Sequence, residues 1–156
     1  MGVRLALAAA AGSALLLIGA FVFQALGYLP CQLCLWQRWP HATAVAAGAA
    51  LLVLPWVLLM VAGFLSAITT AGIGIYHTGV ENAWWPGPAG CAGGGMDLTQ
   101  MGGADLLSTD GPTGVIMCDE VAWAFMGVSM ASWNALFSIG LAVLWAVALR
   151  RRLSAG

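Results

Sequence analysis

The stretch LALAAAAGSALLLIGAFVF, Leu5–Phe23, contains 19 residues without a charge, and it decides the fold class. A helix needs about 20 apolar residues to cross the hydrocarbon core of a bilayer, so this run is long enough for one crossing. A cleavable signal peptide is the rival interpretation, but its apolar core typically has only about 7–15 residues. The sequence therefore predicts a retained membrane-spanning helix here.

Two further uncharged runs, Trp39–Val80 and Val121–Leu149, extend this pattern over most of the chain. The first has 42 residues, enough for two short crossings, and Pro55 near its middle favours a turn. Hydrophobic residues make up 62% of the 156 residues, charged residues make up 7%, and lysine is absent. So few charges cannot cover a water-soluble surface, and no basic run suits nucleic acid.

The distribution of charge predicts the orientation. Arg4 precedes the first run and Arg150–Arg152 follow the last, so the preference of positive residues for the cytoplasmic side places both termini there. All six acidic residues lie between Glu81 and Glu120. We therefore predict an all-α membrane protein, a single domain over residues 1–156, folded as a four-transmembrane-helix bundle with two non-cytoplasmic loops. The predicted spans are about 4–23, 41–55, 56–77 and 131–149, and the predicted outer loops are about 24–40 and 78–130.

Helices in lipid associate through small residues and a few polar groups. We expect close contacts at Gly12, Gly127, Ala131 and Ala135. Asn134 is expected to donate a hydrogen bond across the bundle.

The four cysteines all fall in the predicted outer loops, on the side where disulfides persist. Cys31 and Cys34 form a C-x-x-C pair, while Cys91 and Cys118 are separated by 26 intervening residues in the second loop. Of the three possible pairings, the spacing suggests Cys31–Cys34 and Cys91–Cys118. The second disulfide suits a structural staple, but the first closes so small a loop that it constrains the unfolded chain little. The Cys31–Cys34 pair is therefore expected to serve redox chemistry, because a C-x-x-C motif makes a thiolate available.

A zinc site formed by all four cysteines is a third interpretation. Structural zinc sites normally combine two short knuckles, and Cys91 and Cys118 do not form one.

Arg38 lies four residues after Cys34 and is the only basic residue expected on the outer side. If a helix begins near Cys34, the two side chains share a face. A guanidinium beside a thiolate stabilises the anion. An arginine that merely extends towards the interface is the alternative.

Three segments of the chain, CQLCLWQR, YHTGVENAWWPGPAGC and CDEVAWAFMGVSMASWN, resemble those of the DsbB family. The resemblance covers nearly the whole chain. It implies a bacterial inner-membrane protein with periplasmic cysteine loops. Such a protein reoxidises a DsbA-like thiol oxidase of the periplasm and passes the electrons to a membrane quinone, either ubiquinone or menaquinone, without a metal.

The roles of six residues follow from the resemblance. Cys91 resembles the cysteine that the partner's thiolate attacks, and Cys118 resembles its mate, which then attacks Cys31. Cys34 resembles the cysteine whose thiolate faces the quinone. Arg38 and His77 resemble the arginine and histidine on the quinone side. The sequence departs from the family at Gln37, where many members have glutamate, so Arg38 is expected to be less paired.

Two alternatives remain open at this point. A quinone-linked reductase of the vitamin K epoxide reductase type is also a four-span bundle with C-x-x-C, although there the motif usually lies late in the bundle. A membrane scaffold with two structural disulfides would have neither a bound quinone nor turnover.

Overall fold

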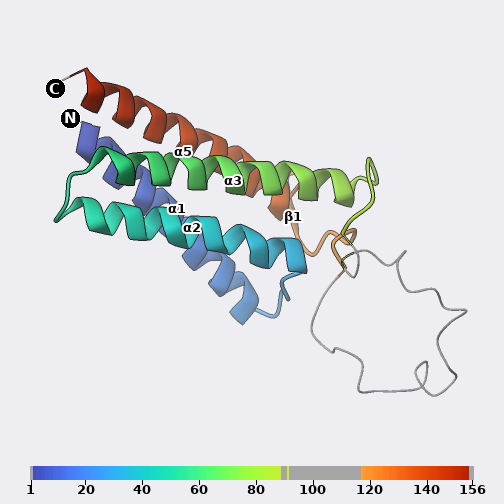
Figure 1. Ribbon diagram of the computed structural model, residues 1–156. Coiled ribbons are helices and arrows are strands. Elements are labelled where there is room, and N and C mark those ends of the chain that lie inside the picture. Colours follow the sequence, from blue (N-terminus) through green and yellow to red (C-terminus); the bar gives the residue numbers. More distant parts are fainter. Residues whose placement is uncertain (1, 89–90, 92–116, 155–156) are drawn as a thin grey trace, which may run out of the picture.

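A computed structural model describes residues 2–88, 91 and 117–154 of the chain (Figure 1). Helices dominate these residues. They are α1 (Gly2–Ala25), α2 (Gln32–Leu51), α3 (Val57–Glu81) and α5 (Met130–Leu153). A short antiparallel hairpin, β1 (Ala124–Phe125) and β2 (Val128–Ser129), precedes α5.

The helices form a closed bundle in which each packs against two others. The contacts run from α1 to α2, from α2 to α3, from α3 to α5 and from α5 back to α1. Figure 1 shows both termini at the same end of the bundle as the turn between α2 and α3. That turn lies between Leu51 and Val57, so the break expected near Pro55 is confirmed. The C-x-x-C motif and the hairpin lie at the opposite end (Figure 1).

Three of the four helices, α1, α3 and α5, are long and apolar enough to cross a membrane. The remaining helix, α2, has 20 residues and therefore a length of about 30 Å, which matches the hydrocarbon core of a bilayer. Its first turns carry polar residues, Gln32, Gln37, Arg38 and His41, and this reduces its hydropathy.

The first predicted outer loop, about 24–40, is mostly helical. Helix α2 begins at Gln32 and includes Pro40, whereas we expected the second span to start near residue 41. The predicted span followed the uncharged run that begins after Arg38, whereas the helix extends beyond that run and tolerates Pro40. In the structure the helix starts before Pro40, with Cys31 as its N-cap: the Sγ atom of Cys31 accepts a hydrogen bond from the backbone N–H of Cys34.

Small residues bring the helices close together, as expected for a bundle in lipid. A Cβ atom added at Gly48 of α2 would overlap Ala10 of α1, and one added at Gly63 of α3 would overlap the ring of Trp145. Gly12 faces Leu141 in the same way, and Ala131 and Ala135 are buried, so these three expectations hold.

The expectation for Gly127 is wrong. Gly127 lies in the turn of the hairpin with φ 78°, and Met126 before it has φ 53°. Two successive residues with positive φ are typical of the two-residue turn whose twist matches a β-hairpin. Gly127 is not at a close contact between helices, because a Cβ atom added there would meet nothing within 4 Å.

Candidate functional site

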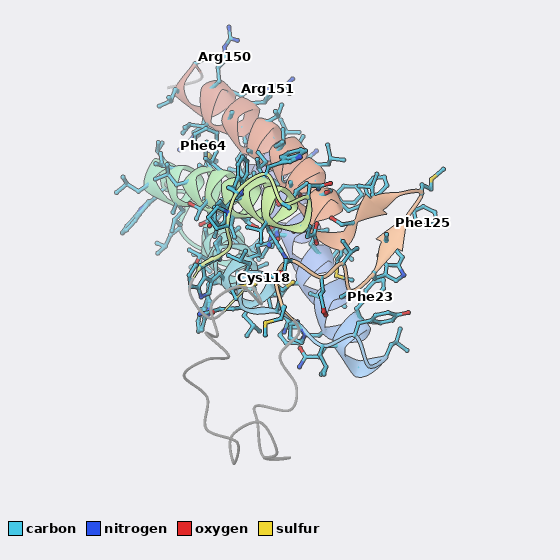
Figure 2. The ribbon with its side chains drawn as sticks, turned by 90° about the vertical axis from the view of Figure 1, so that its right-hand side faces the viewer. Phe23, Phe64, Cys118, Phe125, Arg150 and Arg151 are labelled. Carbon is cyan, nitrogen blue, oxygen red and sulfur yellow. A yellow bond between two sulfur atoms is a disulfide. The ribbon has the colours of Figure 1, made fainter. Side chains whose placement is uncertain are left out.

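The cysteines gather at the end of the bundle opposite the termini. A buried cluster, which we call the sulfur cluster, contains Cys31, Cys91 and Cys118 together with Leu33 and Val80, and the partly buried Cys34 packs against it. Figure 2 looks onto this end and shows Cys118 near the centre of the bundle, with Phe23 and Phe125 to one side. The structure thus unites residues from the N-terminus of α2, the end of α3 and the segment before the hairpin.

The two predicted cysteine pairs are in different states. Cys91 and Cys118 form a disulfide with their Cα atoms 5.1 Å apart, so this pairing is confirmed. Cys31 and Cys34 are free thiols, and the Cys31 thiol donates a hydrogen bond to the Cys34 sulfur over 3.0 Å. A bond between them in the oxidised protein stays a prediction.

The environment of Cys31 disfavours its thiolate. The hydrogen bond to the Cys34 side chain, followed by burial, raises the pKa of Cys31 above its ordinary value. The backbone N–H of Cys34 opposes this shift, but it is outweighed. If these cysteines form a disulfide, Cys31 is therefore the poorer leaving group of the two, because a thiol with a high pKa leaves slowly.

His77, from the last turn of α3, reaches the sulfur cluster. Its Nε2 atom lies 3.4 Å from the Sγ atom of Cys31 and 3.8 Å from Oε1 of Glu81. Its Nδ1 atom lies 3.1 Å from Nε2 of Gln37 on α2. The sequence pointed to His77 only through the resemblance. The structure brings the side chain into contact with the C-x-x-C motif.

The ligand atoms of Cys31, His77 and Cys118 all lie within 4.8 Å of one another. Such a cluster is compatible with a metal ion, but the sulfur of Cys118 is bonded to Cys91 in this state. Structural zinc normally requires four ligands with ionised thiols, so the described cluster does not fit zinc while the disulfide is intact. The same proximity suits transfer of a disulfide from one cysteine pair to the other.

A tryptophan ties the chain leading to Cys91 back onto α3. Trp85 stacks on Tyr76 with ring centroids 6.0 Å apart, and its indole N–H donates to the Tyr76 carbonyl oxygen over 2.9 Å. The Tyr76 hydroxyl donates in turn to the Pro86 carbonyl oxygen. A Cβ atom at Gly79 would overlap the Trp85 ring, so this clamp depends on glycine there.

We expected the loop around Cys91 to reach a soluble partner. Most of that loop, residues 89–90 and 92–116, lies outside the described residues. Cys91 itself is buried, with 2% of its surface exposed. Its sulfur is therefore not open to a soluble protein in this arrangement.

A cavity of about 410 Å³ opens beside the C-x-x-C motif. Its lining is mostly apolar and comes from the outer half of α1, the first turns of α2 and α5, the end of α3 and the hairpin segment. Among the lining residues are Cys34, Arg38 and His77, together with the aromatic residues Phe23, Tyr28, Trp123, Phe125, Trp133 and Phe137. Cavities of this size and composition typically bind small apolar molecules.

Arg38 lines the same cavity, but its guanidinium is held by α1. Its Nη1 atom donates to Oε1 of Gln24 over 2.7 Å, and its Cζ atom lies 4.9 Å from the centroid of the Phe21 ring. Its Nε atom is buried and has no hydrogen-bond partner among the described residues. Arg38 therefore adds a fixed positive charge to the lining of the cavity.

Sequence reasoning missed most of the polar side chains behind the site. Gln37, His41 and Thr70 are buried, and they are connected by hydrogen bonds to Asn134, whose donation across the bundle is confirmed. The sequence did indicate a shared polar face, since Gln37 and His41 are four residues apart, one helical turn, on α2. Glu81 stands in the same relation to His77 on α3.

A helical bundle with spans apolar enough for a membrane, and with two cysteine pairs in contact at one end, defines the class of membrane thiol–disulfide oxidoreductases. Within that class the chain belongs to the DsbB family: the family described as "Disulfide bond formation protein DsbB" matches residues 3–148. The family consists of bacterial inner-membrane oxidoreductases of disulfide bond formation. No curated protein and no solved structure matches the chain.

The contact between the two pairs can be tested by trapping. In a Cys34→Ser, Cys91→Ser double variant, Cys31 and Cys118 are the remaining thiols, and we expect mild oxidation to join them because their Sγ atoms lie within 4.8 Å. Mass spectrometry of the digested protein checks the bond. The matched control is Cys31→Ser, Cys91→Ser, which leaves Cys34 and Cys118 and should crosslink less. Equal crosslinking of both variants would contradict the described position of Cys31.

Proposed function

We propose that this protein is a thiol:quinone oxidoreductase that reoxidises a DsbA-like dithiol oxidase and delivers the electrons to a membrane quinone. The observation that carries the proposal is the approach of Cys118 to Cys31 within the sulfur cluster. This contact connects two cysteine pairs. One is the Cys91–Cys118 disulfide, which a partner can reduce, and the other is the C-x-x-C pair, which lines an apolar cavity. The family match favours this function over a vitamin K epoxide reductase type of activity or a scaffold.

The relay begins at Cys91. A thiolate of the partner attacks the Cys91 sulfur, a mixed disulfide forms, and Cys118 leaves as a thiolate. Because Cys91 is buried in the described arrangement, docking of the partner must first uncover it. The partner's second thiol then breaks the mixed disulfide, so that the partner leaves oxidised and two electrons remain on the enzyme.

The second exchange transfers the electrons to the C-x-x-C pair. The Cys118 thiolate attacks Cys31 of an oxidised Cys31–Cys34 pair, and Cys34 leaves as a thiolate. The high pKa of Cys31 favours this direction over attack on Cys34, since the better leaving group departs faster. Re-formation of the Cys31–Cys34 and Cys91–Cys118 disulfides then accompanies the transfer of two electrons out of the protein.

The cavity beside Cys34 fits a quinone as the acceptor. Its volume and aromatic lining suit a flat ring, and the Arg38 guanidinium in that lining is a charged hydrogen-bond donor that suits a ring carbonyl. When bound there, a quinone supplies a two-electron acceptor that dissolves in lipid. Arg38 would hold that ring, while His77 and the wall formed by Phe23 and Trp123 would orient it beside Cys34.

We further propose that α2 also crosses the membrane, which gives four spans with both termini in the cytoplasm and the cysteines in the periplasm. The common end of the two termini supports an even number of crossings (Figure 1). Arg150, Arg151 and Arg152 in the last turn of α5 support the orientation.

A membrane-impermeant thiol reagent tests this orientation. After reduction of intact spheroplasts, we expect labelling of Cys91 and Cys118, and we expect no labelling of a cysteine introduced at Ser154, because the reagent cannot cross the bilayer. Lysis should expose the cysteine at position 154. Labelling of position 154 before lysis would contradict the orientation.

The order of exchange predicts a trapped intermediate. In a Cys118→Ala variant Cys91 is a free thiol, so it can attack the disulfide of an oxidised DsbA-like partner and release the partner's other cysteine as a thiolate. A covalent complex through Cys91 should then accumulate, because no Cys118 thiol is present to break it. Non-reducing electrophoresis and peptide mapping measure the complex. A bond mapped to Cys31 or Cys34 instead would show that the partner enters at the other pair.

The role of Arg38 predicts a defect in quinone use. Arg38→Met should reduce the steady-state rate of quinone reduction with a reduced DsbA-like partner by at least about tenfold, the order expected when a charged donor is lost. It should leave the Cys91–Cys118 disulfide intact. Arg38→Lys should be intermediate, because lysine keeps the charge without the planar fork. An Arg38→Met rate equal to that of the wild type would contradict this role.

A further inference from the structure

Behind the sulfur cluster runs a chain of hydrogen bonds of which only His77 has a role in the proposed relay. We call it the amide–imidazole chain; its members are His77, Gln37, Asn134, His41 and Thr70. It connects α2, α3 and α5 in the interior of the bundle, and four of its five side chains are at most 6% exposed: Gln37, His41, Thr70 and His77. Hydrogen bonds between protein groups therefore set the direction of the chain.

Thr70 determines which groups donate and which accept at the end of the chain farthest from the sulfur cluster. Its hydroxyl lies 3.4 Å from the backbone carbonyl oxygen of Gln37, which can only accept, so the Thr70 hydroxyl is the donor there. The same oxygen lies 3.2 Å from Nε2 of His41 and must accept from it. His41 therefore carries its proton on Nε2.

The other nitrogen of His41 agrees with this assignment. Nδ1 of His41 is buried and has no hydrogen-bond partner among the described residues. A bare acceptor in that position costs less than an orphaned N–H donor, which is rare in buried sites. A neutral His41 with its proton on Nε2 avoids the orphaned donor.

The direction passes from His41 to His77 through two amides. The single Nε2–H of His41 is shared between the Thr70 hydroxyl at 3.2 Å and Oδ1 of Asn134 at 2.9 Å. Because Oδ1 of Asn134 accepts there, the Asn134 amide nitrogen faces Oε1 of Gln37 and Oγ1 of Thr70. The Gln37 amide then presents its nitrogen to Nδ1 of His77. Since Nδ1 of His77 accepts, a neutral His77 carries its proton on Nε2, the atom that faces Cys31.

We propose that Asn134 is a positioning residue that, acting through Gln37, holds His77 in the Nε2–H tautomer and thereby directs a hydrogen-bond donor at the sulfur cluster. A ring nitrogen of His77 lies within 4.8 Å of the sulfurs of both Cys31 and Cys118, and Nε2 is the nitrogen that lies 3.4 Å from the Cys31 sulfur. Negative charge moves between these sulfurs during disulfide exchange, and a donor already in place stabilises it. In the other tautomer, a lone pair would face the sulfurs instead.

The tautomer can be observed directly, because the chain contains only two histidines, His41 and His77. In protein labelled with ¹⁵N and ¹³C histidine, the ring nitrogen shifts report which nitrogen carries the proton. We expect Nε2–H for both rings in the wild type near neutral pH. This readout requires neither a partner nor a quinone, so it remains valid even if the proposed relay fails.

Asn134→Asp is the decisive variant, since it keeps the shape but replaces the donor to Gln37 by an acceptor. Gln37 should then reverse its amide and present Oε1 to His77, which should shift its proton to Nδ1. The rate of quinone reduction, which rests on the proposed function, should fall by at least about tenfold. Ser138→Ala is the control: Ser138 lies one turn further along α5, is fully buried and has no hydrogen-bond partner among the described residues.

A second variant covers the case in which Asn134→Asp does not fold. Gln37→Glu keeps the hydrogen bond from Asn134 but places a carboxylate at Nδ1 of His77, which should then bind a proton. The His77 signals should change while those of His41 stay. Either an Nδ1–H tautomer of His77 in the wild type, or unchanged His77 signals in both variants, would overturn the proposal.

Discussion

The architecture depends on one constraint: the hydrocarbon core offers no partner for a buried polar group, so the partners that such groups have must come from the bundle itself. The amide of Asn134 meets this constraint by donating to α2 and α3 at once, to Gln37 and to Thr70. This hydrogen bonding fixes the rotation of α2, which carries the C-x-x-C motif in its first turn. The position of the reactive sulfurs therefore follows from hydrogen bonds formed deeper in the bundle.

The apolar runs in the sequence were sufficient to predict the helices and the turn near Pro55, because lipid imposes a length that composition reveals. They were not sufficient for the start of α2. Helix α2 begins at Gln32. The N-cap supplied by Cys31 and the packing of α2 in the bundle offset the loss of a backbone hydrogen bond at Pro40. The hairpin was also missed. Its strands have two residues each, and its turn, Met126–Gly127, has only the glycine as a signal.

The residue types of the candidate site could be predicted from the sequence, but the contacts between their side chains could not. The spacing of the cysteines indicated both pairs, and the resemblance supplied Arg38 and His77. Neither indicated that the Arg38 guanidinium would bind Gln24 and Phe21 of α1, or that Gln37 would face His77. Such contacts depend on the rotation of helices about their axes, which an apolar sequence with little periodicity leaves undetermined.

The clamp formed by Trp85 has a kinetic consequence. It anchors one side of the disulfide to α3, while Cys118 lies beside Cys31, so both acceptors for the Cys118 thiolate are held at high effective concentration. One acceptor is the mixed disulfide at Cys91, and attack there returns the reduced partner. The other is Cys31, and attack there commits the electrons to the enzyme. In the proposed relay, the return attack on Cys91 competes with release of the partner by its own second thiol and with attack on Cys31. The yield of each docking event therefore depends on how readily Cys34 departs.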